Sequence, residues 1–375
     1  MTEIKKILII RLSAVGDVIN TLPVLRLLRK HYPQSYIGWA VEEKAKDLLD
    51  GDPDINELIV GSWKHDLLPT IPGSNSLHSN CQCIVFRRAR HALAPGNIFG
   101  AVPEFIKALR RTGYDVALDF QGNLKSGLVS YLSKAKERIG FAPPASKEYN
   151  YLFNNQTVSL PEPHINRIEK NLYLLRALGI YETGLPKDSI IDISGLTSVD
   201  PLAGRPADRL VIIHPGTSAF GAYKRWAPDR YGQLADRLIS ELKCQVLLSW
   251  GPGEKPLVEQ IAAGMKSKPI ILDYSQSLKQ LAVLLSKATL FIGSDSAPLH
   301  LANILRRPLI GLYGPKDPVV YGPWPNRPDA VVIRKELECS PCAKRACDSP
   351  VKGPEPKCME LITVDDVFAA AKGLL

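Results

Sequence analysis

Continuous apolar runs alternate with amphipathic stretches along most of the chain, and the first half shows the pattern most simply. An uninterrupted apolar run is typical of a parallel strand, because helices cover both faces of such a sheet. The runs that predict strands here are residues 6–10, 36–41, 57–60 and 115–120. Apolar side chains at helical spacing predict helices over residues 18–28, 104–114 and 170–180, the last one ending at Gly179.

The second half repeats this alternation with a different set of turns. Its apolar runs predict strands at residues 209–216, 245–250, 269–274, 289–295 and 306–315. Helical spacing predicts helices at residues 229–242, 256–265 and 278–288. Two such series predict an α/β protein with two doubly wound domains that face one another.

Segments with neither continuous apolar runs nor helical spacing of apolar residues mark the domain boundaries. Residues 181–208 are polar and rich in turn-forming residues, so we place an interdomain linker there. The N-terminal domain is then residues 1–180, and the C-terminal domain is residues 209–360, followed by a helix over residues 361–375. Residues 62–100 are rich in Pro, Gly, Ser, Asn and Arg and predict a long irregular insertion in the first domain.

Composition narrows the class of protein. The chain has 375 residues, of which 45% are hydrophobic and 23% charged, as in ordinary globular proteins. No apolar run approaches the roughly 20 residues that span a bilayer, and the first one is too short for a signal peptide, so we expect a cytoplasmic protein. The net charge of +9 favours an anionic partner. Nucleic acid is the least favoured of these, because the chain has no nucleic-acid-binding signature and no long Lys/Arg block.

The stretch "SAVGD" places an acid, Asp17, directly after Gly16, where the first strand gives way to a helix. Glycine permits a tight turn at such a point. The helix dipole favours an ionised carboxylate near a helix start, so Asp17 is a candidate proton acceptor. An aspartate that only caps the helix is the simpler interpretation of this stretch taken alone.

Three strand-to-helix turns in the second half carry small and polar residues. In "HPGTSAFGAYKRW", Thr217, Ser218 and Lys224 can meet a phosphate, although the segment is weak evidence by itself. In "GSDSAPLHLA" a strand ends at Asp295 and a helix begins near Pro298, which builds an anion site at a helix start. In "WGPGE" the Glu254 carboxylate can accept hydrogen bonds from ribose hydroxyls, or it is simply an acid at a helix start. Together these turns predict a domain that holds a diphosphate, because ligands of open α/β sheets bind at the carboxyl ends of strands.

Four of the seven cysteines lie near the C-terminus, which argues against a secreted disulfide framework. Their spacing, C-x2-C-x4-C-x10-C, is compatible with a structural zinc site in a cytoplasmic protein. Reduced cysteines that pack a loop are the alternative interpretation. The four residues are Cys339, Cys342, Cys347 and Cys358.

The chain resembles the glycosyltransferase family 9 heptosyltransferases, which build the inner core of lipopolysaccharide. The segments "GDVINTLPVLRLLRKHYP", "DFQGNLKSG", "HPGTSAFGAYKRW", "GSDSAPLHLA" and "LYGPKDP" occur in the expected order. The segments "WAVEE" and "DFQGNLKSG" are more similar to heptosyltransferase I than to II. The resemblance implies a GT-B fold, with two Rossmann-like domains facing across a cleft. It also implies an ADP-heptose donor and inversion at the anomeric carbon, with no cofactor or metal required for catalysis.

On the donor side, the resemblance assigns Lys224, Thr217 and Ser218 to the diphosphate and Glu254 to the ribose. The loop before Lys224 is longer than in the family, and the loop before Glu254 is one residue shorter. The resemblance also assigns Asp295 to the donor site. Three neighbouring residues fall on the same turn and helix start: Ser296, Ala297 and His300.

On the acceptor side, Asp17 matches the catalytic base of the family, which takes the proton of the attacking hydroxyl. Lys224 and the backbone N–H groups of residues 296–299 would then stabilise the charge on the departing ADP. The candidate acceptor-binding residues are Gly16, Gln121, Gly122 and Lys125. The implied acceptor is Kdo-lipid A at the anionic inner-membrane surface, where the enzyme would be peripheral.

A basic group in the first domain could meet the phosphates and carboxylates of that acceptor. It comprises Arg87, Arg88 and Arg90, with Lys107, Arg110 and Arg111 further along. A solvated basic loop and helix face is an equally good interpretation.

Three other functions fit parts of the pattern. A transferase of the same family could use another acceptor, as heptosyltransferase II does, or another nucleotide sugar. A non-catalytic nucleotide-sugar-binding protein would need no base such as Asp17. A GT-B epimerase would need acids placed for elimination, and the sequence has no matching pattern.

Overall fold

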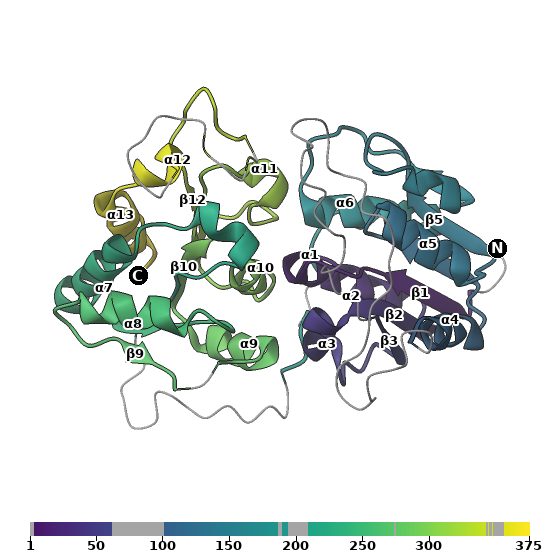
Figure 1. Cartoon of the computed structure of the whole chain (residues 1–375), viewed down its shortest axis with the longest axis horizontal. Coiled ribbons are helices and arrows are strands. Elements are labelled where there is room, and N and C mark those ends of the chain that lie inside the picture. Colours follow the sequence, from purple (N-terminus) through teal and green to yellow (C-terminus); the bar gives the residue numbers. More distant parts are fainter. Residues whose placement is uncertain are drawn as a thin grey trace, which may run out of the picture. The chain divides into compact units, whose positions relative to one another are not determined.

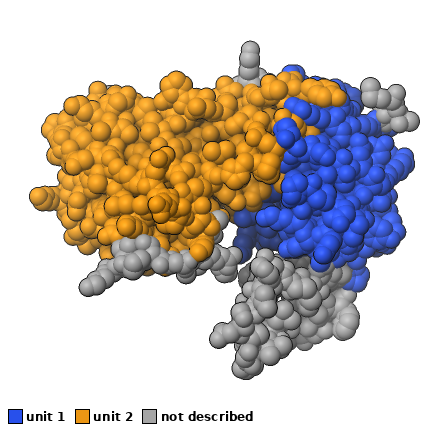
Figure 2. All heavy atoms as spheres, turned by 90° about the horizontal axis from the view of Figure 1, so that it is seen from above, with its two compact units in different colours: residues 1–14, 28–161, 174–180 blue, residues 15–27, 162–173, 181–375 orange. Residues whose placement is uncertain are grey.

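The computed structural model describes residues 4–61, 101–186, 190–193, 209–273, 275–342, 344, 347 and 356–375. The chain forms two compact units, coloured separately in Figure 2. Unit 1 contains residues 1–14, 28–161 and 174–180, and unit 2 contains residues 15–27, 162–173 and 181–375. Two segments that precede the expected linker, residues 15–27 and 162–173, thus pack with the second unit.

Unit 1 is built on a parallel sheet of six described strands in the order β3-β2-β1-β4-β5-β6 (Figure 1). The strands are β1 (Lys6–Ile10), β2 (Tyr36–Glu42), β3 (Glu57–Gly61), β4 (Val116–Asp119), β5 (Glu137–Phe141) and β6 (Gln156–Val158). The helices of this half of the chain are α2 (Leu22–His31), α3 (Glu43–Leu49), α4 (Ala101–Arg111) and α5 (Leu124–Leu132), with short 3-10 helices η1 (Asn150–Phe153) and η2 (Leu175–Leu178). The apolar side chains of β1 are fully buried, as expected of a central parallel strand.

Unit 2 repeats the same strand order, read from its other edge, as β12-β11-β10-β7-β8-β9. The strands are β7 (Leu210–His214), β8 (Gln245–Leu248), β9 (Ile270–Ile271), β10 (Leu290–Ser294), β11 (Leu309–Leu312) and β12 (Ala330–Ile333). The helices are α1 (Val15–Ile19), α6 (Arg167–Leu174), η3 (Ala219–Lys224), α7 (Pro228–Leu242), α8 (Lys255–Ala263), α9 (Leu278–Lys287), α10 (Ala297–Ile304), α11 (Pro318–Tyr321), α12 (Lys357–Glu360) and α13 (Val364–Leu374).

The structure confirms two doubly wound α/β sheets and the C-terminal helix. The expected helix over residues 18–28 is divided, however, into α1 and α2. Pro23 lacks a backbone N–H and suits the first turn of a new helix, so the break falls at Asn20 and Thr21. The expected strand at residues 269–274 pairs only over Ile270 and Ile271. Helices α3 and α5 and strands β5, β6 and β12 are additional to the prediction.

Several expected segments lie outside the described residues. These are residues 62–100, including Arg87, Arg88 and Arg90, and most of the linker at 181–208. Among the described residues, no helix combines the length and the apolar character needed to cross a membrane.

Candidate active site

In the sheet of unit 2, β7 and β10 lie next to each other. The chain continues from β7 to one edge of the sheet, through β8 and β9, and from β10 to the opposite edge, through β11 and β12. Ligands of open α/β sheets bind at the carboxyl ends of strands at such a point. His214 ends β7, and Ser294, which ends β10, is followed directly by Asp295. The predicted donor residues therefore lie at the position where this fold binds ligands.

Asp295 is held between two cationic or polar side chains. Its Oδ2 accepts a hydrogen bond from Lys224 Nζ at 2.5 Å, and its Oδ1 lies 3.3 Å from His300 Nε2. Burial opposes ionisation of this carboxyl, but the hydrogen bonds and charges of His300 and Lys224 outweigh burial and hold the pKa of Asp295 well below its usual range. Asp295 is thus a buried carboxylate that anchors both partners.

Helix α1, which carries Gly16 and Asp17, packs against α10 within unit 2 and brings Gly16 to this cluster. The imidazole of His300 lies so close to Gly16 that an added Cβ would be 2.8 Å from His300 Cδ2. Gly16, which we predicted on the acceptor side, therefore contacts a predicted donor residue. Asp17, the next residue, is half-buried and begins the turn that ends in Thr21, whose hydroxyl donates to the Asp17 carbonyl at 2.8 Å.

The start of α10 supplies unsatisfied polar groups. Ser296 is its N-cap residue, but the Ser296 side chain makes no capping hydrogen bond. Within the described part of the chain, the buried Ser296 Oγ has no hydrogen-bond partner. Ala297 and Pro298 follow in the first turn; Pro298 has no N–H, and the N–H groups of Leu299 and His300 donate to the Ser296 carbonyl at 3.1 and 3.3 Å. This helix start, beside Lys224 and Asp295, is suited to an anion.

The loop after β7 is folded by an arginine that the sequence analysis did not assign. Arg225 Nε donates to Thr217 Oγ1 at 3.0 Å, and Arg225 Nη2 donates to the Thr217 carbonyl at 2.5 Å. Thr217 is buried and its neighbour Ser218 is exposed. The extra residues before Lys224 form η3, so the longer loop is a compact turn that carries Lys224 back toward Asp295.

Glu254 lies beside the same strand ends. Its Oε2 accepts a hydrogen bond from the Gly251 N–H at 2.8 Å and lies 3.4 Å from His214 Nε2. An added Cβ at Gly216 would be 2.2 Å from this carboxylate, so any larger residue there would displace the Glu254 side chain. Burial raises the pKa of Glu254, and burial together with the charge of Arg225 lowers the pKa of His214 to about 4. His214, whose Nδ1 lies 3.0 Å from Ser249 Oγ, is therefore a neutral support for this carboxylate at neutral pH.

Arg167 is a second residue that the sequence analysis missed. It begins α6, and its Nη2 donates to the Tyr321 hydroxyl at 3.2 Å. Burial disfavours its charge, but the charges of Asp17, Tyr321 and Asp295 outweigh burial and raise the pKa of Arg167. An arginine at a helix start lacks any spacing signal, so only the structure relates it to the acidic residues.

The predicted acceptor residues of unit 1 follow β4 and form a rigid turn. Gln121 Oε1 accepts from the backbone N–H groups of Leu12 and Ser13, and the N–H of Gly122 donates to Asp119. Asp119 is fully buried, and burial raises the pKa of its carboxyl despite four hydrogen-bond donors. Lys125 is paired with Glu42 at 2.5 Å, so its charge is already partly satisfied within unit 1.

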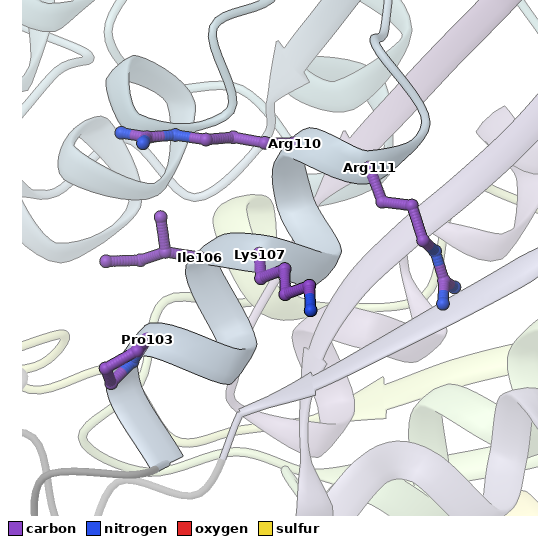
Figure 3. Close-up of a pocket in the computed structure, with 5 residues that line it drawn as sticks. All are labelled: Pro103, Ile106, Lys107, Arg110 and Arg111. Carbon is purple, nitrogen blue, oxygen red and sulfur yellow. The ribbon is translucent and has the colours of Figure 1, made fainter.

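A basic surface lies on α4 in the same unit. Five residues of this helix line a surface hollow of about 640 Å³, and Figure 3 shows their side chains: Pro103, Ile106, Lys107, Arg110 and Arg111. Arg110 Nε donates to the Leu132 carbonyl at 3.0 Å, and Arg111 pairs with Glu57 at 2.5 Å. The predicted Arg87 and Arg88 cannot be compared with this surface, since they lie outside the described residues.

The four C-terminal cysteines of the predicted zinc site differ in exposure. Cys339, Cys342 and Cys347 are exposed thiols and Cys358 is buried. Among the described residues, no group of three or more His, Cys, Asp or Glu side chains is placed to hold a metal ion. The thiols of Cys342 and Cys347 are nonetheless close enough to Cys358 that, with burial, they raise its pKa to about 11. A structural zinc site stays a prediction.

Several known proteins are similar to this chain. A model of the family described as Glycosyltransferase family 9 (heptosyltransferase) matches residues 102–352. The lipopolysaccharide core heptosyltransferase OpsX of Haemophilus influenzae is 27% identical over 335 residues, which are 88% of this chain and 85% of OpsX. The lipopolysaccharide heptosyltransferase 3 of Escherichia coli is 27% identical over 318 residues, 82% of each chain.

The solved structure of E. coli heptosyltransferase WaaC with ADP-2-deoxy-2-fluoro heptose has the same fold. Its TM-score is 0.70 at 20% identity, and the match covers 99% of this chain and all of that one. The predicted GT-B fold, with one Rossmann-like sheet in each unit, is thereby confirmed. Because the family match extends over more than half of the 375 residues, this chain belongs to glycosyltransferase family 9, the heptosyltransferases.

Proposed function

We propose that this enzyme transfers heptose from ADP-heptose to the Kdo-lipid A inner core of lipopolysaccharide, with inversion at the anomeric carbon and no catalytic metal. The observation that carries the proposal is the cluster of Lys224, Asp295 and His300 at the switch point of unit 2, with Gly16, the residue before Asp17, packed against His300. It combines a carboxylate that can accept a proton with a cation and a helix start that can hold a diphosphate.

In the proposed reaction, the Asp17 carboxylate takes the proton of the acceptor hydroxyl as its oxygen attacks the anomeric carbon. The bond from that carbon to the phosphate oxygen breaks, and ADP leaves with the bonding electron pair. Lys224 and the start of α10, with the unpaired Ser296 hydroxyl, stabilise the negative charge that develops on ADP. Glu254, supported by His214, accepts hydrogen bonds from the ribose hydroxyls.

The acceptor carries phosphates and carboxylates and sits in an anionic membrane surface. The net charge of +9 and the basic side chains on α4 support a peripheral, cytoplasmic-side contact with both. Charge reversal at Arg87 and Arg88 should raise the KM for the acceptor and leave the KM for the donor unchanged. Unaltered acceptor kinetics would remove these two residues from the proposed acceptor surface.

The test is a coupled ADP-release assay with purified enzyme, ADP-heptose and Kdo-lipid A, run beside Asp17→Asn. We expect ADP release that requires the acceptor. In the variant, the rate of release should fall at least about 100-fold, while the Kd for ADP stays within about twofold of the wild-type value. A variant that loses ADP binding as strongly as turnover would contradict the role of Asp17.

The same assay separates the alternatives. Release with a heptosylated core but not with Kdo-lipid A would assign the enzyme to the second heptose transfer. Release with a different nucleotide sugar would keep the family and change the donor. Tight ADP binding without release under any of these conditions would favour a non-catalytic nucleotide-sugar-binding protein.

A further inference from the structure

Helix α6 is fixed in unit 2 by polar contacts at two levels. At its start, Asn166 Nδ2 donates to the carbonyls of Val319 and Gly322 at 3.3 and 3.0 Å, and its Oδ1 accepts from the N–H of Ile168. One turn later, Asn171 Nδ2 donates to the Asn20 carbonyl at 3.0 Å and to Thr21 Oγ1 at 3.1 Å. The helix is therefore held against α11 at one end and against the α1–α2 turn at the other.

This double attachment determines what Arg167 faces. Arg167 and Asn171 are four residues apart and share one face of α6. Asp17 and Thr21 are also four residues apart, and the Thr21 hydroxyl donates to the Asp17 carbonyl. Asn171 meets Asn20 and Thr21 directly after α1, so Arg167 lies one turn of α6 from this contact and Asp17 lies one turn before Thr21. The charge of Asp17 accordingly acts on Arg167 and raises its pKa.

The Arg167 guanidinium is held in position, but not all of its hydrogen-bond donors have a partner. Tyr321 holds it from the other side, through the hydrogen bond to its hydroxyl and through its ring, whose centroid is 5.1 Å from Arg167 Cζ. Within the described residues, the buried Arg167 Nε has no hydrogen-bond partner. A purely structural arginine normally has its buried donors paired, so the spare donor calls for a functional explanation.

We propose that Arg167, clamped by Tyr321, is the positioning residue for Asp17: its guanidinium fixes the carboxylate and keeps it ionised for proton transfer. The proposal rests on the function proposed for Asp17 above. The charged and titratable groups that the structure describes at the neighbouring start of α10 are Asp295, His300 and Lys224, and these pair with one another. Arg167 is the cation whose pKa the charge of Asp17 raises.

The test compares Arg167→Gln and Arg167→Lys with the wild type in the ADP-release assay from pH 5 to 9. Lys170→Gln, which removes a positive charge from the same helix, is the matched control. For Arg167→Gln we expect kcat at neutral pH to fall about tenfold or more, and the acid limb of the kcat–pH profile to move up by about one unit. The Kd for ADP should stay within about twofold. Arg167→Lys should restore part of the shift, and Lys170→Gln should reproduce none of it.

A double variant tests whether the effect passes through Asp17. Once Asp17→Asn has removed the base, Arg167→Gln should cost little further turnover, because both changes disable one unit. Equal losses in both backgrounds, or a loss of ADP affinity that matches the loss of kcat with an unmoved acid limb, would overturn the proposal. The second result would make Arg167 a phosphate ligand.

A readout without turnover separates this proposal from the proposed function. Thermal unfolding of the two single variants and the double variant gives the coupling between Arg167 and Asp17 directly. If the variants show this coupling but the wild-type enzyme releases no ADP with any donor, the proposed transferase function is rejected and the proposed interaction of Arg167 with Asp17 is kept. An active wild type with additive unfolding effects would reject the positioning role alone.

Discussion

Lys224 Nζ lies 2.5 Å from Asp295 Oδ2, so the lysine expected to hold the donor diphosphate is itself held by a buried carboxylate. Both side chains are more than four-fifths buried. Removal of one partner from such a pair leaves the other charge buried and uncompensated, which costs about 3 kcal/mol or more. The pair therefore links the stability of unit 2 to the state of its active site.

We expect Asp295→Asn to lower the stability at pH 7 by about 3 kcal/mol. The pKa of the folded-state carboxyl lies below the value of about 3.9 in an unfolded chain. The wild-type advantage is thus complete above that pH and shrinks as the pH falls from about 4 toward the folded value. Chemical denaturation at several pH values measures it.

Lys136→Met is the control for that experiment. It breaks an exposed pair with Asp115, at 2.8 Å, and should lower the stability much less than Asp295→Asn does, because solvent screens the exposed pair. A difference between wild type and Asp295→Asn that stays constant down to pH 2.5, or that is no larger than the control's, would contradict the prediction.

Gly16→Ala should impair catalysis through a single methyl group. Its Cβ would lie 2.8 Å from His300 Cδ2, so either α1 or the imidazole must move. Because Asp17 is the next residue, we expect kcat to fall about tenfold to 100-fold, with a loss of stability of about 1–3 kcal/mol from overpacking.

The matched control for this glycine is Gly184→Ala, where an added Cβ would meet no described atom within 4 Å. We expect it to retain full turnover. If His300→Ala restores kcat to Gly16→Ala in part, the contact with the imidazole is the cause of the loss. Full activity of Gly16→Ala by itself would show that the close approach has no role in catalysis.

Glu254→Gln tests the assignment of the ribose site. A hydrogen bond to a charged carboxylate contributes about 1.5–3 kcal/mol, so the wild type should prefer ADP to 2′-deoxy-ADP or 3′-deoxy-ADP by at least about tenfold. The larger of these two preferences should shrink to a few-fold in Glu254→Gln. Isothermal titration of the three nucleotides gives the comparison.

Glu259→Gln is the matched control, because Glu259 lies on α8, the helix that Glu254 precedes, and pairs loosely with Lys255 at 3.8 Å. This variant should keep the wild-type preference for ADP over the deoxynucleotides. If Glu254→Gln discriminates against both deoxynucleotides as strongly as the wild type, then the Glu254 carboxylate serves the fold rather than the nucleotide.

The periodicity of apolar residues was sufficient to predict both sheets and most of their helices. Buried parallel strands such as β1 and β7 are continuous apolar runs, and that signal is local. The short strands β6 and β12 and the break between α1 and α2 lack such a signal, since pairing at a sheet edge and a proline decide them. Residue types in the turns after strands likewise pointed to Lys224 and Asp295, and the family resemblance added His300.

Contacts between segments that are distant along the chain could not be predicted from the sequence. Arg167 is 150 residues from Asp17, and Arg225 closes the Thr217 loop through side-chain geometry that no spacing expresses. Packing of α1 against α10 also sets Gly16 on His300, a contact between two predicted site residues that no sequence spacing expresses. Such relations depend on the tertiary arrangement of α1, α6 and α10.

The cysteines offer a chemical test of the predicted zinc site. Without a metal, the exposed Cys339, Cys342 and Cys347 should react with iodoacetamide well before Cys358, which is buried and whose pKa is raised to about 11. With zinc bound as the spacing predicts, all four thiols should be protected together, and a chelator should expose them together.

Elemental analysis of the purified enzyme, paired with timed alkylation and peptide mass spectrometry, distinguishes the two cases. Cys244 is the internal reference for the alkylation rate of a buried thiol, because it lies in the hydrophobic core of unit 2 and is remote in sequence from the other four cysteines. About one zinc per chain with joint protection would support the site. Labelling of the three exposed thiols at the rate of a free cysteine, with no zinc present, would leave them as reduced residues of a surface loop.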